Sequence, residues 1–276
     1  MKFQNKDFGD PLDLPLFKGR INPDFKQPLL LEKLEACDRL LQEMGSHIFT
    51  NHRNRVGLVQ LPLSEKKSLE FVIKEFRPRG LNKLKNIFFK SRAQKAWRGG
   101  ILLMEKGIST PIPVAYLESK KSFPTKHSYY LTVMERGGEE IRQLFRKLQG
   151  GELEWFLRDL ARHIYFYHER GILHRDLSDG NILVKKSDEG EYVFSLIDTN
   201  RIKITKRMGI YRRIKNIIRL GIPPLHQSFF LKQYTEKERL KKNIWYWYWI
   251  NKKRYTHYTH LKRKFLAIRK KLIWDE

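Results

Sequence analysis

The chain has 276 residues, of which 41% are hydrophobic and 13% aromatic, so it is not a disordered polar chain and can bury the core of one large or two-lobed domain. Its 56 Lys and Arg outnumber 30 Asp and Glu, and the net charge of +26 favours anionic partners without choosing between nucleic acid, a membrane and a phosphorylated substrate. A single cysteine excludes an intrachain disulfide, which suits a reducing compartment.

Residues 1–45 predict an N-terminal leader and a helix. Pro and Gly are scattered over residues 1–28, which indicates an extended segment, and apolar periodicity predicts a helix over residues 29–44 that ends at Gly45. Cys37 falls within this helix, and we expect it to be a small core residue and not a reactive thiol.

The start of the chain does not read as a secretory signal, because no apolar run follows its charged residues. No stretch approaches the ~18 apolar residues that a spanning helix needs. We therefore expect a cytoplasmic protein that can still lie on a membrane surface.

Residues 46–136 predict a small lobe built on a sheet. Apolar runs at 56–61 and 69–76 are separated by a polar turn, which is typical of a β-hairpin. Two further strands are expected at 111–117 and 129–134.

One helix is expected between these pairs of strands, after a basic linker at 77–90. Ser91 is a suitable cap for a helix over 92–106, and Gly107 is a suitable stop. Two glycines inside it, Gly99 and Gly100, each cost about 1 kcal/mol relative to Ala, so we expect a short or kinked helix.

Residues 137–240 predict a larger, mostly helical lobe. An apolar stripe from Leu153 to Tyr167 predicts a helix that ends at Gly171, and a loop and a β-hairpin at 182–184 and 192–197 follow it. A basic aromatic helical tail fills residues 241–276. The fold class expected from this order is α+β, with two lobes: a small antiparallel sheet with one helix on it, and a larger, mostly helical lobe.

The chemistry is concentrated in the string His174-Arg175-Asp176-Leu177-Ser178-Asp179-Gly180-Asn181, which matches a kinase catalytic loop and is followed by Asp198. Asn181 stands at the beginning of the first predicted hairpin strand and Asp198 after the second. Those two ends of an antiparallel hairpin are neighbours, so both side chains can reach one Mg²⁺ ion. Asp176 then projects from the loop towards an acceptor hydroxyl. The alternative is a chance match in a turn between a helix and a strand.

Lys74 is the expected cation on the nucleotide phosphates. It ends the string Phe71-Val72-Ile73-Lys74, which resembles the strand motif that carries this lysine in kinases. The alternative is a solvated strand lysine. We assign Gly57 and Met134 to the ATP site as well, Gly57 because it lies in the hairpin that covers the phosphates.

The chain resembles the bacterial lipopolysaccharide kinase (Kdo/WaaP) family. The resemblance rests on Trp97 with the residues before it, on residues 107–113, on the catalytic loop, on residues 196–201, and on Phe230-Leu231-Lys232-Gln233-Tyr234. It implies a two-lobed, protein-kinase-like α+β fold that uses ATP and Mg²⁺. It also implies phosphorylation of a sugar hydroxyl of the lipopolysaccharide core, or of a related envelope glycan, at the cytosolic face of the inner membrane.

The resemblance also implies residue roles. Asp176 would orient or deprotonate the hydroxyl, Asn181 and Asp198 would hold Mg²⁺, and Lys74 would bind the phosphates. Arg175 and Arg201 would steady the loop or contact phosphate.

Three features depart from kinase patterns. The metal-binding triplet reads Asp198-Thr199-Asn200, no glycine-rich loop covers the phosphates, and Ala96 stands where many relatives carry the glutamate that pairs with the lysine. Glu105, on the same helix, is a substitute partner for Lys74. These departures keep open a pseudokinase scaffold that binds nucleotide or membrane, and a protein Ser/Thr kinase is a third reading.

The tail interleaves Trp and Tyr with Lys and Arg, with no Asp or Glu from 241 to 274. Such a composition favours an anionic membrane surface, and a glycolipid acceptor fits the same location. The alternative is a helix whose aromatic residues pack on the large lobe. Nucleic acid is the least favoured partner, and His257 and His260 have no further ligands around them that would indicate a metal site.

Overall fold

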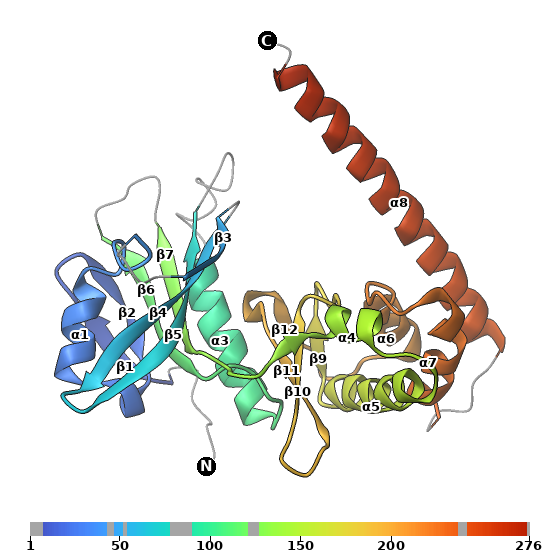
Figure 1. Ribbon diagram of the computed structural model, residues 1–276, viewed down its shortest axis with the longest axis horizontal. Coiled ribbons are helices and arrows are strands. Elements are labelled where there is room, and N and C mark those ends of the chain that lie inside the picture. The colour runs from blue at the N-terminus through green and yellow to red at the C-terminus, as the bar shows by residue number, and fades with distance from the viewer. Residues whose placement is uncertain are drawn as a thin grey trace. The chain divides into compact units, whose positions relative to one another are not determined.

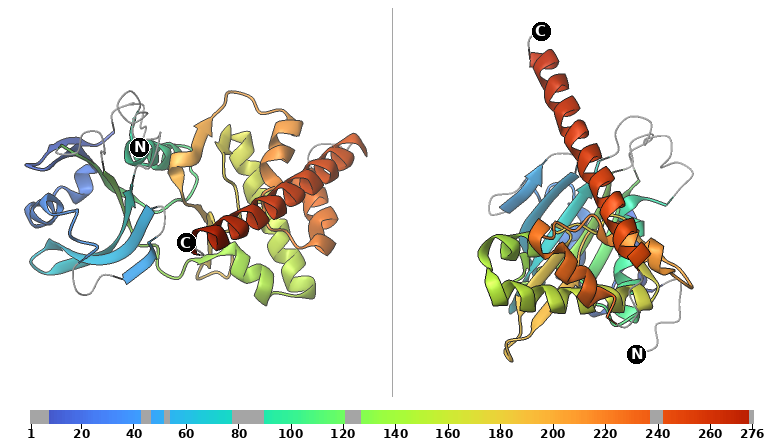
Figure 2. Two further views of the ribbon diagram at one scale, coloured as in Figure 1. Left: turned by 90° about the horizontal axis from the view of Figure 1, so that it is seen from above. Right: turned by 90° about the vertical axis from the view of Figure 1, so that its right-hand side faces the viewer.

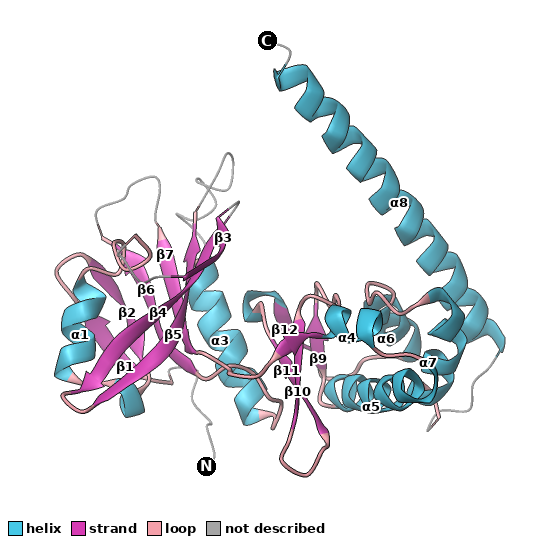
Figure 3. Ribbon diagram, in the orientation of Figure 1, coloured by secondary structure: helices cyan, strands magenta, loops and turns pink. Residues whose placement is uncertain are grey.

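The computed structural model describes residues 8–42, 47–51, 54–77, 90–120, 127–236 and 242–274. The chain forms two compact units, shown in Figures 1 and 3. The first unit combines Met1–Gly138 with Ser195–Ile202, and the second combines Glu139–Phe194 with Lys203–Glu276. The short segment that carries Asp198 therefore belongs to the first unit, although it lies far along the chain.

The first unit is built on a seven-stranded sheet in the order β1-β2-β6-β7-β5-β4-β3, in which all neighbours are antiparallel. The predicted hairpin is confirmed as β4 and β5, which lie between β7 and the edge strand β3 and are joined by a turn at Glu65 and Lys66. The strands are β1 (Asp10–Asp13), β2 (Phe17–Ile21), β3 (His47–Asn51), β4 (Asn54–Ser64), β5 (Lys67–Phe76), β6 (Pro113–Ser119) and β7 (Ser128–Val133).

The N-terminal residues differ from the expected leader. Residues 10–21 form β1 and β2, and β2 pairs with β6 at the edge of the sheet. Alternation within β2 explains the difference, because Phe17 and Ile21 point into the core. Gly19 lets the two strands approach closely, since a Cβ there would lie 1.8 Å from the carbonyl oxygen of Tyr116.

The first helix is shorter than the sequence predicts. A 3-10 turn (Pro23–Phe25) leads into α1 (Pro28–Glu35), and Ala36 leaves the helical conformation. The chain then continues as tight turns, in which the Cys37 amide donates to the Leu34 carbonyl at 3.2 Å. The predicted end at Gly45 lies outside the described residues.

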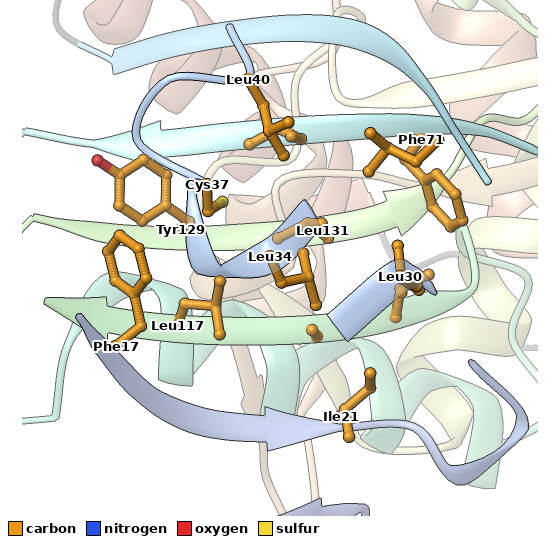
Figure 4. Packing of buried hydrophobic residues seen from close by; sticks show 14 of the residues in the cluster. Phe17, Ile21, Leu30, Leu34, Cys37, Leu40, Phe71, Leu117, Tyr129 and Leu131 are labelled. Atoms are coloured by element: carbon orange, nitrogen blue, oxygen red, sulfur yellow. The ribbon is translucent and has the colours of Figure 1, made fainter. Parts of the chain in front are cut away.

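Helix α1 and these turns complete the core on one face of the sheet (Figure 4). Leu30, Leu34 and Leu40 pack on Phe71 and Leu131 of the strands, and all are buried. Cys37 is fully buried among them, and burial raises the pKa of its thiol, so the prediction of a core cysteine is confirmed.

The other face of the sheet is covered by α3 (Arg92–Glu105). The side chain of Ser91 accepts from the Gln94 amide at 3.0 Å, and Gly107 adopts a φ of 64°, so both predicted end signals are confirmed. Trp97 packs here with Tyr116 and Tyr130. The predicted linker lies outside the described residues over 78–89.

The second unit is mostly helical. The predicted stripe helix is confirmed as α5, whose Phe156, Leu160 and Ile164 are fully buried. Its helices are α4 (Ile141–Lys147), α5 (Gly150–Glu169), α6 (Ile210–Ile217), α7 (Gln227–Tyr234) and α8 (Lys242–Trp274), with a 3-10 turn at Pro224–His226. Its short strands are β8 (Glu139–Glu140), β9 (Ile172–His174), β10 (Ile182–Lys186), β11 (Tyr192–Leu196) and β12 (Ile202–Ile204), and the last residues of β11 and the first of β12 group with the first unit.

The tail helix α8 is buried near its start and exposed further along, and its binding to a membrane stays a prediction. Ile244 and Tyr248 near its start are buried in the second unit, whereas Tyr258, Leu261 and Phe265 are exposed. Figures 1 and 2 show the later part of α8 running clear of the other helices of its unit. No helix in the described ranges is both long and apolar enough to cross a membrane.

Candidate active site

Lys74 lies in the middle of the first unit's sheet, on the face that carries α3. On β5 it pairs with Val56 of β4 and Tyr130 of β7, and it alternates with Ile73, which points into the opposite core. Its ammonium forms an ion pair with Asp198, and both side chains are about four-fifths buried. The predicted lysine therefore binds a carboxylate of the site and is not a solvated strand residue.

Asp198 is presented by an unusual backbone conformation. It has φ 56° and ψ 44°, and it is the one non-glycine residue with a positive φ in the part of the chain that the structure describes. Asp tolerates this left-handed region better than most residues, but it still marks a constrained position. The 3-10 turn Thr199–Arg201 follows directly.

This turn is attached to α3. The Thr199 hydroxyl donates to the Ala96 carbonyl at 2.7 Å. A Cβ on Gly99 would lie 2.1 Å from the Thr199 carbonyl oxygen, so only glycine allows the turn to approach this closely. Before Asp198, the Thr110 hydroxyl donates to the Leu196 carbonyl at 2.7 Å. The glycine that the sequence treats as a cost to the helix therefore helps to place Asp198.

The expected glutamate partner of Lys74 is absent from α3 in the described residues. Ala96 contributes only its carbonyl, and Glu105 forms no ion pair with Lys74. Burial raises the pKa of Glu105. The suggestion that Glu105 substitutes as the partner is wrong, because it stands at the far end of the helix, and Asp198 takes this role.

Gly57 and Met134, which the sequence assigns to the nucleotide site, make other structural contacts. A Cβ on Gly57 would meet Leu41 and Ile48 within 3 Å, so its small size serves the core on the face opposite Lys74. The Met134 amide donates to the Glu70 carbonyl at 2.9 Å, which leaves its carbonyl and its half-buried side chain for other contacts. Nucleotide binding by either residue stays a prediction.

The catalytic loop lies in the second unit and is held by its own side chains. His174 is buried, and its Nδ1 accepts from the Asp176 amide at 3.2 Å. The Asn181 side-chain amide donates to the Asp176 carbonyl at 2.7 Å. That bond orients Asn181 so that its Oδ1 stays available as an oxygen ligand.

A series of buried side-chain hydrogen bonds supports this loop. His168 of α5 contacts the Tyr234 hydroxyl through Nδ1 at 2.6 Å and the Asn216 Oδ1 through Nε2 at 3.0 Å. The Asn216 side-chain amide of α6 donates to the His174 carbonyl at 2.8 Å. Three helices are thus connected to the strand that leads into the loop.

The protonation of His168 follows from its partners. Burial lowers its pKa to about 4, so the imidazole is neutral at pH 7. Asn216 Oδ1 can only accept, so Nε2 carries the proton and the Tyr234 hydroxyl donates to Nδ1. Tyr234 is the last of residues 230–234, which resemble a motif of the lipopolysaccharide kinase family, and this hydrogen bond gives that motif a structural role.

Arg219 is the residue that sequence reasoning missed. Its Nη1 donates to Asp176 Oδ1 at 2.5 Å and to the Arg175 carbonyl at 3.0 Å. The side chain of Arg175 itself is exposed, and Arg201 Nε lies 3.9 Å from Asp198 Oδ2. Arg219 stands 43 residues after Asp176, outside any local motif, so no spacing signal could have found it.

Comparison with known proteins identifies the family. A sequence model described as the lipopolysaccharide kinase (Kdo/WaaP) family matches residues 92–241, which is more than half of the chain. The chain belongs to the lipopolysaccharide kinase (Kdo/WaaP) family. No curated protein matches the sequence.

The fold agrees with this family, although the structural likeness by itself is broad. The structure matches 1171 solved chains. One of them is described as WaaP in complex with acyl carrier protein, with a TM-score of 0.55 and 18% identity over 80% of this chain and 92% of that chain. The expected α+β kinase-like fold is confirmed, and membership of the Kdo/WaaP family supports a phosphotransferase that uses ATP.

The side chains present fit the groups that a Kdo/WaaP kinase implies. In the first unit, Lys74 offers an ammonium for phosphate and Asp198 a carboxylate oxygen. In the second unit, Asn181 offers an amide oxygen, and oxygen ligands are those that Mg²⁺ prefers. Within the described ranges, no group of three or more His, Cys, Asp and Glu side chains could hold a metal ion. A bound Mg²⁺ would therefore depend on few protein ligands together with water and phosphate oxygens, as is usual at nucleotide sites.

Proposed function

We propose that this protein transfers the terminal phosphate of ATP to a sugar hydroxyl of the lipopolysaccharide core or of a related envelope glycan. The observation that carries the proposal is the held catalytic loop, in which Asp176 and Asn181 are fixed by His174, Arg219 and the buried hydrogen bonds behind them. A scaffold that binds no substrate at this loop would not need a carboxylate fixed in this way.

Each residue of the site has a defined part in the proposed reaction. Asp176 orients the acceptor hydroxyl and accepts its proton. Lys74 binds the phosphates, and Asn181 Oδ1 with Asp198 holds Mg²⁺, which would neutralise charge on the phosphates. Arg175, whose side chain is exposed beside the loop, contacts phosphate. Gly57 and Met134 complete the nucleotide site.

A membrane location fits the acceptor. The later half of α8 exposes Tyr258, Leu261 and Phe265 together with Lys262 and Lys264, and no acidic residue lies among them. Aromatic rings favour the headgroup region and lysines favour anionic lipids. We propose that this half binds the cytosolic face of the inner membrane, where a glycolipid acceptor is accessible.

Mass spectrometry of lipopolysaccharide tests the acceptor. Cells that lack the protein should yield lipopolysaccharide without one core phosphate, and the wild-type chain should restore it, whereas Asp176→Ala should not. Asp188→Ala is the matched control, because Asp188 is exposed in the β10–β11 turn, away from the loop. Unchanged glycan in the deletion strain would refute the proposed acceptor, and nucleotide binding without turnover would favour the scaffold.

A further inference from the structure

The first half of α8 reaches the segment that carries Arg219. The Lys252 ammonium donates to the Ile218 carbonyl at 2.8 Å and to the Leu220 carbonyl at 2.6 Å, so it holds the backbone on both sides of Arg219. The Tyr255 ring, one turn further along α8, lies 5.7 Å from the Arg219 guanidinium. Two side chains of α8 thus fix the backbone and the head group of one arginine.

Lys252 is well suited to this position. Ile218 and Leu220 follow the last turn of α6, where carbonyls lack helical partners and the helix dipole favours a cation. Burial lowers the pKa of Lys252 to about 8, while the charge of Asp179 acts in the opposite direction. Burying a lysine ammonium costs free energy unless its N–H groups form hydrogen bonds. Here the ammonium donates to two carbonyls.

We propose that α8 positions the catalytic loop: Lys252 and Tyr255 fix Arg219, and Arg219 orients the carboxylate of Asp176. The continuous path runs from α8 through Arg219 Nη1 to Asp176 Oδ1. This inference rests on the proposed phosphotransferase function, and it assigns the two halves of α8 different roles. The first half supports the loop, whereas the later half is the proposed membrane contact.

The helix supplies matched controls for each positioning residue. Lys253 is the next residue after Lys252, but its side chain is exposed and lies 5.1 Å from the Trp249 ring of the same helix. Tyr258 is 61% exposed and stands one turn after Tyr255. Removing either control changes charge or aromatic content equally without touching Arg219.

The first measurement needs no activity. Hydrogen exchange of the backbone amides at 172–182 should speed up several-fold in Lys252→Met and Tyr255→Leu, and stay unchanged in Lys253→Met and Tyr258→Leu. If Lys252→Met does not fold, Tyr255→Leu carries the same test, because it leaves both carbonyl contacts of Lys252 in place. Equal exchange in all four variants would overturn the proposal.

The second measurement uses the full chain, ATP, and lipopolysaccharide from cells that lack the protein. We expect Lys252→Met to lower kcat about 10- to 100-fold with little change in KM for ATP, because a misoriented Asp176 affects the chemical step. Lys252→Arg should restore most of kcat, since a guanidinium can donate to both carbonyls. An unchanged kcat in Lys252→Met would contradict the proposal. Absence of transfer by the wild-type chain, with loop exchange still sensitive to Lys252→Met, would instead refute the proposed function alone.

Discussion

The two carboxylates that we place at the site, Asp198 and Asp176, are held in different ways. Asp198 is held largely through backbone atoms: its own left-handed conformation and a turn whose Thr199 hydroxyl binds the Ala96 carbonyl of α3, in addition to the ion pair with Lys74. Asp176 is held through side chains, because Arg219 binds its carboxylate and Asn216 binds the strand before it. The position of Asp198 should therefore be sensitive to single backbone changes, and that of Asp176 to the loss of any of the buried hydrogen bonds behind the catalytic loop.

The largest effect is expected at Asp198. Asp198→Asn replaces the proposed charged ligand of Mg²⁺ and the anionic partner of Lys74 with a neutral amide, and should lower kcat about 10³-fold or more. Stability should change little, because Asn adopts the left-handed conformation readily. Asp198→Ala should lose activity equally but unfold more easily, by about 1 kcal/mol. Urea denaturation and steady-state kinetics on both variants check this, and similar kcat values for wild type and Asp198→Asn would refute the metal role.

The second largest effect is expected from breaking the buried hydrogen bonds that support the loop of Asp176. Asn216→Ala removes the hydrogen bonds that its side chain makes to His168 Nε2 and to the His174 carbonyl in a buried region, which should lower the free energy of unfolding by about 3 kcal/mol. Asn243→Ala, at an exposed position near the start of α8, is the control and should change little. If denaturant titration shows that Asn216→Ala lowers the free energy of unfolding by less than about 1 kcal/mol, these hydrogen bonds do not stabilise the loop.

The glycine that faces Asp198's turn should tolerate no side chain. Gly99→Ala places a methyl group 2.1 Å from the Thr199 carbonyl, so we expect destabilisation of about 2 kcal/mol despite the higher helix propensity of Ala. Gly151→Ala in α5 meets nothing within 4 Å and should be stabilising by up to about 1 kcal/mol. Thermal unfolding of both variants gives the comparison. Equal shifts would show that α3 and the turn do not pack closely.

The smallest effect expected is a pH dependence from His168. Its pKa is about 4 in the folded chain, below the ordinary value of 6.5, so the unfolded chain binds the proton first as pH falls. This contribution is complete above pH 6.5 and is lost towards pH 4, which amounts to about 1 kcal/mol between pH 8 and 5.5. His168→Gln keeps both hydrogen bonds without titrating. Wild type should therefore lose more stability than His168→Gln over this range, and identical pH profiles would contradict a neutral buried His168.

Local signals in the sequence predicted the elements that depend on near neighbours. Ser91 and Gly107 mark the ends of α3, and the polar turn after β4 marks the hairpin of β4 and β5. Each of these is set by residues within a few positions. The strand motif placed Lys74 within β5 but did not predict its ion pair with Asp198.

What the sequence could not predict depends on contacts between distant positions. Asn216 and Arg219 lie 42 and 43 residues from the atoms they bind. Nothing in their own neighbourhood distinguishes Asn216 from an ordinary helix residue or Arg219 from an ordinary residue of the turn after α6. The fit of Gly99 against Thr199 is of the same kind. The first strands were missed because Pro and Gly suggested a leader, whereas their apolar residues are buried only once β6 is beside β2.

The most direct test of phosphate transfer is the rate at which purified protein moves the terminal phosphate of ATP to lipopolysaccharide from cells that lack it, with and without Asp176→Ala. We predict transfer by the wild-type chain and a loss of about 10²- to 10⁴-fold in the variant, since the hydroxyl would lack its orienting carboxylate. Transfer at the wild-type rate by Asp176→Ala would contradict the role assigned to the catalytic loop.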